Sequence, residues 1–275
     1  MQELIPGGRL WRCTACESMF RHPILPWPTY QQLYESGAAT QWSGGEHRHD
    51  LEVVRSIIAA EKVACSVLDV GCGAGDFLLS LPAAHTRAGI EPSVAAAAGA
   101  LARGVSVVAG SVSALPSAAR FDVITIVDVI EHVPDPGSLL REAYEHVSPG
   151  GLLIVSTGDP ENPLWRGVFK SRFWYCSFPE HLSFPSCLFF RNWGASQQAR
   201  AVTKLAIRYQ ACSLWEMAVG WVMQAAYLVS PAAFNWVGRC TGRLLRPAAR
   251  RRRSYSPGVP GLFVDHQVVT IRRSE

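Results

Sequence analysis

The sequence predicts an α/β protein built on a doubly wound, mostly parallel sheet. Short apolar strands alternate with helical stretches between about residues 62 and 158. One of these strands runs directly into a glycine-rich turn, Gly71-x-Gly73-x-Gly75, which precedes a helix. Alternating strands and helices need crossover connections, and these make neighbouring strands parallel and place helices on both faces. The 275 residues are enough for such a core with additions.

Each element follows from its local pattern. Apolar residues at helical spacing predict a helix over about 49–61, and further helices are expected at 77–81, 93–102 and 136–146. Short apolar runs bounded by turn residues predict strands at 66–70, 85–90, 105–109, 121–127, 151–156, 203–211 and 265–272.

Four segments are expected. Residues 1–45 read as irregular, 46–211 as the core domain, 212–262 as an apolar and basic helical insertion, and 263–275 as the last strand of the core. The insertion combines a long uncharged run with an arginine cluster, which is the formal signature of a membrane span. A span is disfavoured because the last strand must return to the sheet. A substrate lid, a homodimer contact, or an element at 214–253 that lies on a membrane surface fits better.

Composition narrows the class of protein. Hydrophobic residues make up 48% of the chain and charged residues 17%, which is typical of a globular protein. The net charge of +4 is concentrated in the arginine cluster, so no nucleic-acid groove is expected. Eight scattered cysteines, without a secretory signal, indicate reduced thiols and a cytoplasmic protein, with attachment to the inner membrane face as the alternative.

The glycine turn is the first candidate site. Glycines let a backbone turn sharply and approach a ligand closely. The spacing differs from the dinucleotide fingerprint, which seats a pyrophosphate, and an acidic residue, Asp69, precedes it. This pattern favours a ligand with a positively charged amino group. Glu91, about 20 residues further on, stands where a ribose diol needs an acceptor, although it could instead cap the following helix.

These residues carry a family resemblance. The segments 67–77, 88–93, 121–133 and 148–154 resemble, in order, four motifs of class I S-adenosylmethionine-dependent methyltransferases, in the group that includes ubiquinone-type, sugar and natural-product enzymes. The resemblance implies a Rossmann-like sheet of seven strands, S-adenosylmethionine as the cofactor, and methyl transfer to a small-molecule acceptor.

The resemblance also implies site residues. Asp69 and the turn would hold the methionine part of the cofactor, Glu91 the ribose hydroxyls, and Ser111 and Val112 the adenine; a serine stands where the family commonly has an acidic residue. Asp128 and His132 would line the methyl-transfer side. The full set of expected cofactor-binding residues is Asp69, Gly71, Cys72, Gly73, Gly75, Glu91, Pro92, Ser111, Val112 and Asp128.

Two groups could remove a proton from the acceptor. The first is Asp128-x-x-Glu131-His132, where His132 could act as general base. The same triplet resembles a divalent-metal site of ubiquinone O-methyltransferases, or it could be framework. The second is Glu180-His181 in an aromatic stretch, which resembles a segment of sugar C-methyltransferases that supplies a base; a lid whose histidine bonds to backbone is the alternative. We expect His132, Glu180 and His181 to be catalytic, with no resident metal.

The N-terminal Cys13-x-x-Cys16 resembles the back half of a zinc ribbon. A structural zinc needs four ligands, and no second pair with suitable spacing is present, so we expect a remnant without zinc. Two other functions stay open. A non-catalytic scaffold with the same fold would explain Ser111, and a nucleic-acid methyltransferase would use the arginine cluster, but the motif for gripping a flipped base is missing.

Overall fold

A computed structural model describes residues 9–26, 28–30, 32, 48–170, 173, 175–176, 180–209, 218, 221–222 and 264–275. Nearly all of the predicted insertion at 212–262 lies outside these residues, so the lid, dimer and membrane alternatives are not tested. No helix in the described part of the chain has the length and apolar character needed to cross a membrane.

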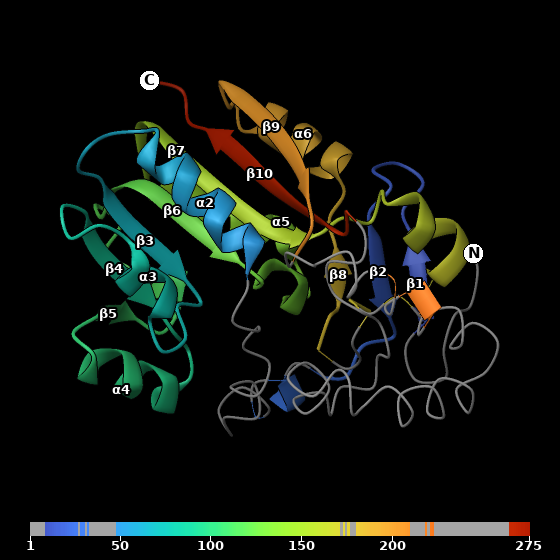
Figure 1. The fold of residues 1–275 in the computed structure, drawn as a ribbon, viewed down its shortest axis with the longest axis horizontal. Coiled ribbons are helices and arrows are strands. Elements are labelled where there is room, and N and C mark those ends of the chain that lie inside the picture. The colour runs from blue at the N-terminus through green and yellow to red at the C-terminus, as the bar shows by residue number, and fades with distance from the viewer. Residues whose placement is uncertain are drawn as a thin grey trace.

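A seven-stranded sheet forms the centre of the molecule, as the sequence predicts (Figure 1). The strand order is β5-β4-β3-β6-β7-β10-β9. The first five of these strands are parallel, and β10 runs antiparallel to both β7 and β9. The strands are β3 (Ser66–Val70), β4 (Thr86–Ile90), β5 (Ser106–Ala109), β6 (Phe121–Val127), β7 (Val147–Gly158), β9 (Ala201–Ile207) and β10 (His266–Arg272).

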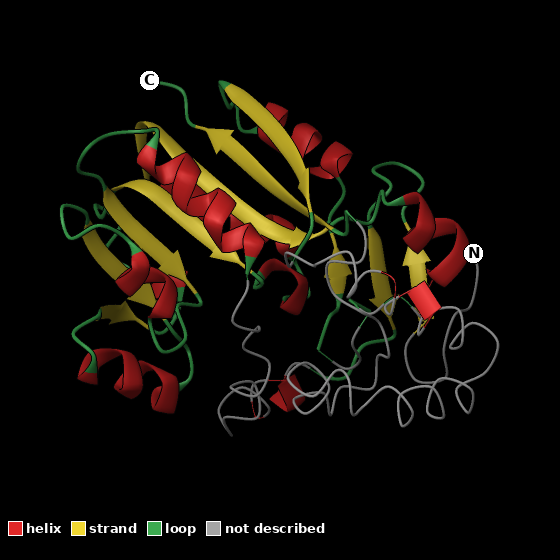
Figure 2. Ribbon diagram, viewed as in Figure 1, coloured by secondary structure: helices red, strands yellow, loops and turns green. Residues whose placement is uncertain are grey.

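Helices cover both faces of this sheet (Figure 2). Apolar side chains of α2, α3 and α4 pack in one core cluster, on one face, with the sheet. Side chains of α5 and α6 pack in a second cluster on the other face. The helices are α2 (His49–Ala59), α3 (Asp76–Ser80), α4 (Val94–Ala102), α5 (Pro136–Glu145) and α6 (Cys187–Ser196), with short turns of helix at η2 (Val112–Ala114), η3 (Ile130–His132) and η4 (Trp165–Phe169).

Strands β7 and β9 and helix α6 differ from the sequence prediction, and β9 spans Ala201–Ile207 rather than 203–211. Strand β7 begins at Val147 rather than 151, because the pairing with β6 shifts register between Phe121 and Val123 and so carries the strand through the Pro-Gly-Gly sequence. Helix α6 was missed in the aromatic stretch. Its start is fixed by Ser186, whose hydroxyl accepts a hydrogen bond from the Phe189 amide and caps the helix.

A second, three-stranded sheet lies beside the carboxyl edge of the large one (Figure 1). It consists of β1 (Arg9–Arg12), β2 (Met19–His22) and β8 (Ser183–Phe184), in that order and all antiparallel. The expectation that 1–45 is irregular is therefore wrong for 9–12 and 19–22, which pair with each other as a hairpin, while β8 pairs with β2 from a distant part of the chain. An aromatic cluster made by Trp165, Phe169, Phe173, Tyr175 and Phe184 supports this small sheet.

Candidate functional site

The carboxyl ends of the parallel strands meet at one edge, where open α/β sheets bind their ligands. The turn after β3 lies there. The amides of Gly71 and Cys72 both donate to the Ile90 carbonyl oxygen, at 2.8 and 3.0 Å, so the turn is anchored to the end of β4.

The three glycines of this turn have positive φ angles, of 76°, 54° and 83°, which L side chains rarely adopt. A Cβ on Gly71 or Gly75 would collide with a valine side chain of the core. A Cβ on Gly73 would meet no atom within 4 Å. Gly73 therefore faces open space, as a backbone position that cradles a ligand must.

Glu91 spans the two halves of this site. One carboxylate oxygen accepts from the Gly73 amide at 2.8 Å, and the other accepts from the Ser93 amide at 2.8 Å. Ser93 itself caps α4 by accepting from the Ala96 amide. The Glu91 carboxylate thus contacts both the glycine turn and the start of α4. The alternative role, in which Glu91 only caps α4, accounts for one of these two contacts.

Asp69 is buried at the end of β3 and accepts a 2.7 Å hydrogen bond from the Thr125 hydroxyl. Burial, with a further contribution from the nearby Glu91 charge, raises the pKa of the Asp69 carboxyl to about 7. A buried carboxylate whose charge is this costly is suited to a positively charged ligand group, which would offset the lost solvation.

The other expected cofactor residues have differing environments. Cys72 is buried, and burial raises the pKa of its thiol to about 12, so it is a packing group. Val112 is also buried in the core, whereas Pro92 and Ser111 are exposed. The Ser111 hydroxyl lies 3.0 Å from that of Ser113. Ser111 is therefore accessible to an adenine, while Val112 could meet one only along its backbone.

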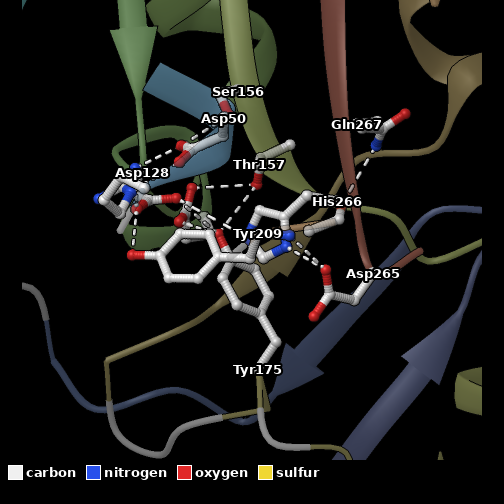
Figure 3. Close-up of polar contacts among 12 residues, drawn as sticks. Asp50, Asp128, Ser156, Thr157, Tyr175, Tyr209, Asp265, His266 and Gln267 are labelled. Carbon is white, nitrogen blue, oxygen red and sulfur yellow. Dashed lines mark hydrogen bonds and ion pairs between the residues drawn. The ribbon is translucent and has the colours of Figure 1, made fainter. Parts of the chain in front are cut away.

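Asp128 follows β6 in a left-handed conformation, with φ of 50°, which a non-glycine residue adopts only when its surroundings hold it there. Its carboxylate pairs with Arg48 at 2.8 Å, accepts from the Tyr209 hydroxyl at 3.2 Å and lies 3.3 Å from the Tyr175 hydroxyl oxygen. The His266 ring nitrogen lies 4.0 Å away. Figure 3 shows Tyr175, Tyr209 and His266 converging on Asp128 from separate parts of the chain.

Glu131 lies in η3, one turn beyond Asp128, and is fully buried. The Tyr175 hydroxyl donates a short hydrogen bond to one carboxyl oxygen, and the Thr157 hydroxyl donates to the other at 3.1 Å. Burial, followed by the Asp128 charge, raises the pKa of Glu131 to about 8. The Tyr175 hydroxyl thus links the two carboxyl groups of the first predicted cluster (Figure 3).

The structure brings the two predicted proton-accepting groups together. The rings of His132 and His181 lie edge to face with their centroids 4.7 Å apart. His132 Nδ1 contacts the Glu180 carbonyl oxygen at 2.9 Å, and His181 Nδ1 contacts that of Tyr175 at 2.5 Å. A carbonyl can only accept, so both rings carry their proton on Nδ1 and a lone pair on Nε2. Burial lowers the pKa of both rings, which keeps them neutral.

Glu180 contacts His132 through its main-chain carbonyl group. Burial raises the pKa of its carboxyl group, and its main chain rather than its side chain orients His132. The lid alternative for Glu180-His181 describes the backbone bonding of His181 correctly, and the same bond leaves the lone pair of the neutral ring on Nε2.

Glu131, His132 and His181 also form a group that could hold a cation. One ligand atom from each lies within 4.8 Å of the others, and two imidazoles with a carboxylate are a common donor set for divalent transition metals. This set differs from the expected Asp128, Glu131 and His132, because Asp128 is turned toward Arg48. The expectation of no resident metal stays a prediction.

Sequence reasoning missed several residues that surround Asp128. Arg48 pairs with Asp128 and, through two donors, with the buried Asp50 of α2. Tyr209 follows β9, and His266 begins β10 beside the buried Asp265. Arg48, Tyr209 and His266 lie at or beside the end of a helix or strand, and this position was the only signal in the sequence for a site. Residues so far apart in the chain form no local pattern.

A parallel sheet with a glycine turn after β3, a buried acid at the end of that strand and a second acid directly after β4 define the class as a Rossmann-like α/β protein. A family model described as a methyltransferase domain matches residues 45–203, more than half of the chain. The chain belongs to the class I S-adenosylmethionine-dependent methyltransferases, and S-adenosylmethionine is the cofactor of that family.

Curated relatives support this assignment. The ubiquinone biosynthesis O-methyltransferase of Pseudomonas entomophila (strain L48) is 37% identical over 123 residues, which cover 40% of this chain and 52% of that protein. The enzyme of the same name from Escherichia fergusonii is 31% identical over 163 residues, which cover 53% and 68%. The chain thus matches between about half and two thirds of the length of these two relatives.

Solved structures show the same fold. Coclaurine N-methyltransferase bound to N-methylheliamine and S-adenosylhomocysteine superposes with a TM-score of 0.51 at 16% identity, covering 91% of this chain and 82% of that one. At this identity the similarity shows the architecture alone.

The residues present fit the cofactor. The open space at Gly73 accommodates a ligand against the backbone, and the buried Asp69 carboxylate matches the cationic amino group of S-adenosylmethionine. Glu91, between the turn and α4, has two carboxylate oxygens for a ribose diol.

Proposed function

We propose that this chain transfers the methyl group of S-adenosylmethionine to a hydroxyl group of a small-molecule acceptor, with phenols as the leading class. The observation that carries the proposal is the cluster of His132, His181, Glu131 and Tyr175 at the carboxyl end of β6, on the same sheet edge as Asp69. Its acid–base groups suit an acceptor that must lose a proton. The O-methyltransferase names of the curated relatives point the same way.

The residues divide into two roles. Asp69, the glycine turn and Glu91 hold the cofactor, with Ser111 at the adenine and Asp128 toward the methyl group. His132 or His181 accepts the hydroxyl proton at Nε2 as the acceptor oxygen bonds to the methyl carbon. When bound, S-adenosylmethionine supplies an electrophilic methyl carbon whose bond to sulfur breaks in that step. Both rings are half-buried, which limits the access of water to the proton transfer.

The first test is titration of the purified chain with S-adenosylhomocysteine in a calorimeter. We expect micromolar binding that Asp69→Ala and Glu91→Ala each weaken at least about 100-fold, since both remove a charge-assisted contact. A folded wild-type chain that binds no S-adenosylhomocysteine would contradict the assignment and favour the non-catalytic scaffold.

The second test measures methyl transfer from labelled S-adenosylmethionine to a para-alkylated catechol. Tyr175→Phe keeps the ring but removes the hydroxyl that links Asp128 and Glu131. We expect kcat to fall about 10- to 100-fold in this variant, with S-adenosylhomocysteine affinity within about twofold of wild type. Transfer to an amine in preference to the catechol would reject hydroxyl methylation.

A further inference from the structure

The small sheet contains a buried cation, Arg21 of β2. Only 3% of Arg21 is exposed. Its Nε donates to the His181 carbonyl oxygen at 2.9 Å, and its Nη2 donates to the Cys176 carbonyl oxygen at 2.6 Å. Its backbone amide donates to the Leu182 carbonyl oxygen at 2.8 Å. Arg21 of the N-terminal hairpin therefore donates three hydrogen bonds to main-chain carbonyls beside the candidate site.

These three points are adjacent to the reacting groups. Cys176 follows Tyr175, whose hydroxyl contacts Asp128 and Glu131 and whose carbonyl orients the His181 ring. Leu182 is held from its other side as well, because its amide donates to the Glu131 carbonyl oxygen at 2.7 Å. Any shift of residues 175–176 and 180–182 would move the Tyr175 hydroxyl and the His181 ring relative to His132.

Burying a guanidinium costs free energy, because the cation loses its hydration. Desolvation accordingly lowers the pKa of Arg21. The fork of a guanidinium can donate to two carbonyl oxygens at once, which neither an apolar side chain nor the single ammonium of a lysine reproduces in the same geometry. The buried charge also helps to keep His181 neutral, after burial itself and the neighbouring His132.

We propose that Arg21 is a positioning residue for methyl transfer, which fixes residues 175–176 and 180–182 so that His181, Tyr175 and His132 meet at the end of β6. The N-terminal hairpin is then a working part of the active site rather than a remnant. The inference rests on the proposed function, in which these side chains accept the acceptor's proton.

The test compares Arg21→Met and Arg21→Lys with Arg273→Met. Arg273 is a matched control because its guanidinium also donates to backbone carbonyls, those of Tyr144, Glu145 and Val147, but at the opposite edge of the sheet. For each variant, kcat with the catechol acceptor, KM for S-adenosylmethionine and affinity for S-adenosylhomocysteine are measured per folded molecule.

We expect Arg21→Met to lower kcat by about 30-fold or more and to leave cofactor KM and affinity within about twofold, because the cofactor turn lies on other strands. Arg21→Lys should recover only part of the rate, since it cannot hold both carbonyls. Arg273→Met should keep kcat within about twofold. Unchanged kcat in Arg21→Met, or a loss of rate matched by equal loss of cofactor binding, would overturn the proposal.

Hydrogen exchange separates this inference from the proposed function. Peptides that cover 175–182 should exchange faster in Arg21→Met than in wild type or Arg273→Met, while peptides from α5 stay unchanged. If the wild-type chain methylates no catechol, this measurement alone decides: equal protection of 175–182 in all three proteins would reject the positioning role.

Discussion

At the scale of single residues, the site depends on buried acids whose charge the fold alone does not satisfy. Within the described residues, Asp69 accepts from the Thr125 hydroxyl, and burial and the Glu91 charge raise its pKa further than Thr125 and the Arg48 charge lower it. A cationic ligand group would supply the missing interaction. The binding of the cofactor and the ionisation of Asp69 should therefore be coupled.

This coupling predicts a pH dependence. Since the pKa of Asp69 is raised to about 7 in the unliganded chain, cofactor binding below pH 7 must first remove a proton. We expect affinity for S-adenosylhomocysteine to weaken up to about tenfold per pH unit below 7 and to level off above it. Asp69→Asn should bind more weakly and lose this slope, as calorimetry between pH 5.5 and 8.5 would show.

The raised pKa of Asp69 also makes the free energy of unfolding depend on pH. A carboxyl whose folded pKa lies above its unfolded value binds more protons in the folded chain, so the unliganded protein loses stability as pH rises from about 4 to 7. Asp69→Asn should lack this loss in urea unfolding. An unchanged pH slope in the variant would show that Asp69 is not the titrating group.

At the scale of elements, the turn after β3 performs two separate tasks. Gly75 begins α3 with φ of 83°, and a Cβ there would come within 2.5 Å of a Val105 methyl group. Gly73 has a positive φ but open space beside it. The sequence pattern predicted one ligand-binding role for the whole turn, whereas the structure separates a glycine packed against Val105 from one beside open space.

The two alanine variants should therefore differ. Gly75→Ala adds a steric clash to backbone strain, and we expect it to lower the unfolding free energy by about 2–3 kcal/mol. Gly73→Ala adds strain alone, about 1 kcal/mol, but its methyl group occupies ligand space and should weaken S-adenosylhomocysteine binding at least tenfold. Urea unfolding and calorimetry on both variants test this. Equal stability losses would contradict the division of tasks.

At the scale of the whole molecule, the candidate site lies between two clusters of packed side chains. The seven-stranded sheet carries the cofactor turn and Asp128. The aromatic cluster around Trp165 supports the small sheet and Tyr175. Trp165 is fully buried, stacks on Phe173 with centroids 4.5 Å apart, and meets Tyr175 edge to face.

Loss of this aromatic cluster should slow methyl transfer but leave the affinity for the cofactor nearly unchanged. We expect Trp165→Ala to lower the unfolding free energy by about 3–5 kcal/mol and to reduce methyl transfer sharply, while S-adenosylhomocysteine affinity stays within about threefold. Trp193→Ala, in the core on one face of the sheet, is the control: it should destabilise the chain but preserve the rate per folded molecule. Equal loss of cofactor affinity in both variants would contradict this.

The sequence by itself determined the elements whose cause is local. The apolar runs, the positive-φ glycines and the acids at strand ends are all properties of a few neighbouring residues. They predicted the parallel sheet, its seven strands through the family resemblance, and the cofactor turn. Strand β3 was predicted with its observed bounds, Ser66–Val70, because a buried run ends there at a glycine.

Only the tertiary structure decided which distant residues share the site. Arg48, Tyr175, Tyr209 and His266 converge on Asp128 from different elements, and Arg21 reaches His181 across 160 positions of the chain. No local pattern encodes these contacts, since each depends on which strand ends meet at the sheet edge. Periodicity is set by the backbone geometry of one segment, whereas the pairing of buried charges is set by how the segments pack together.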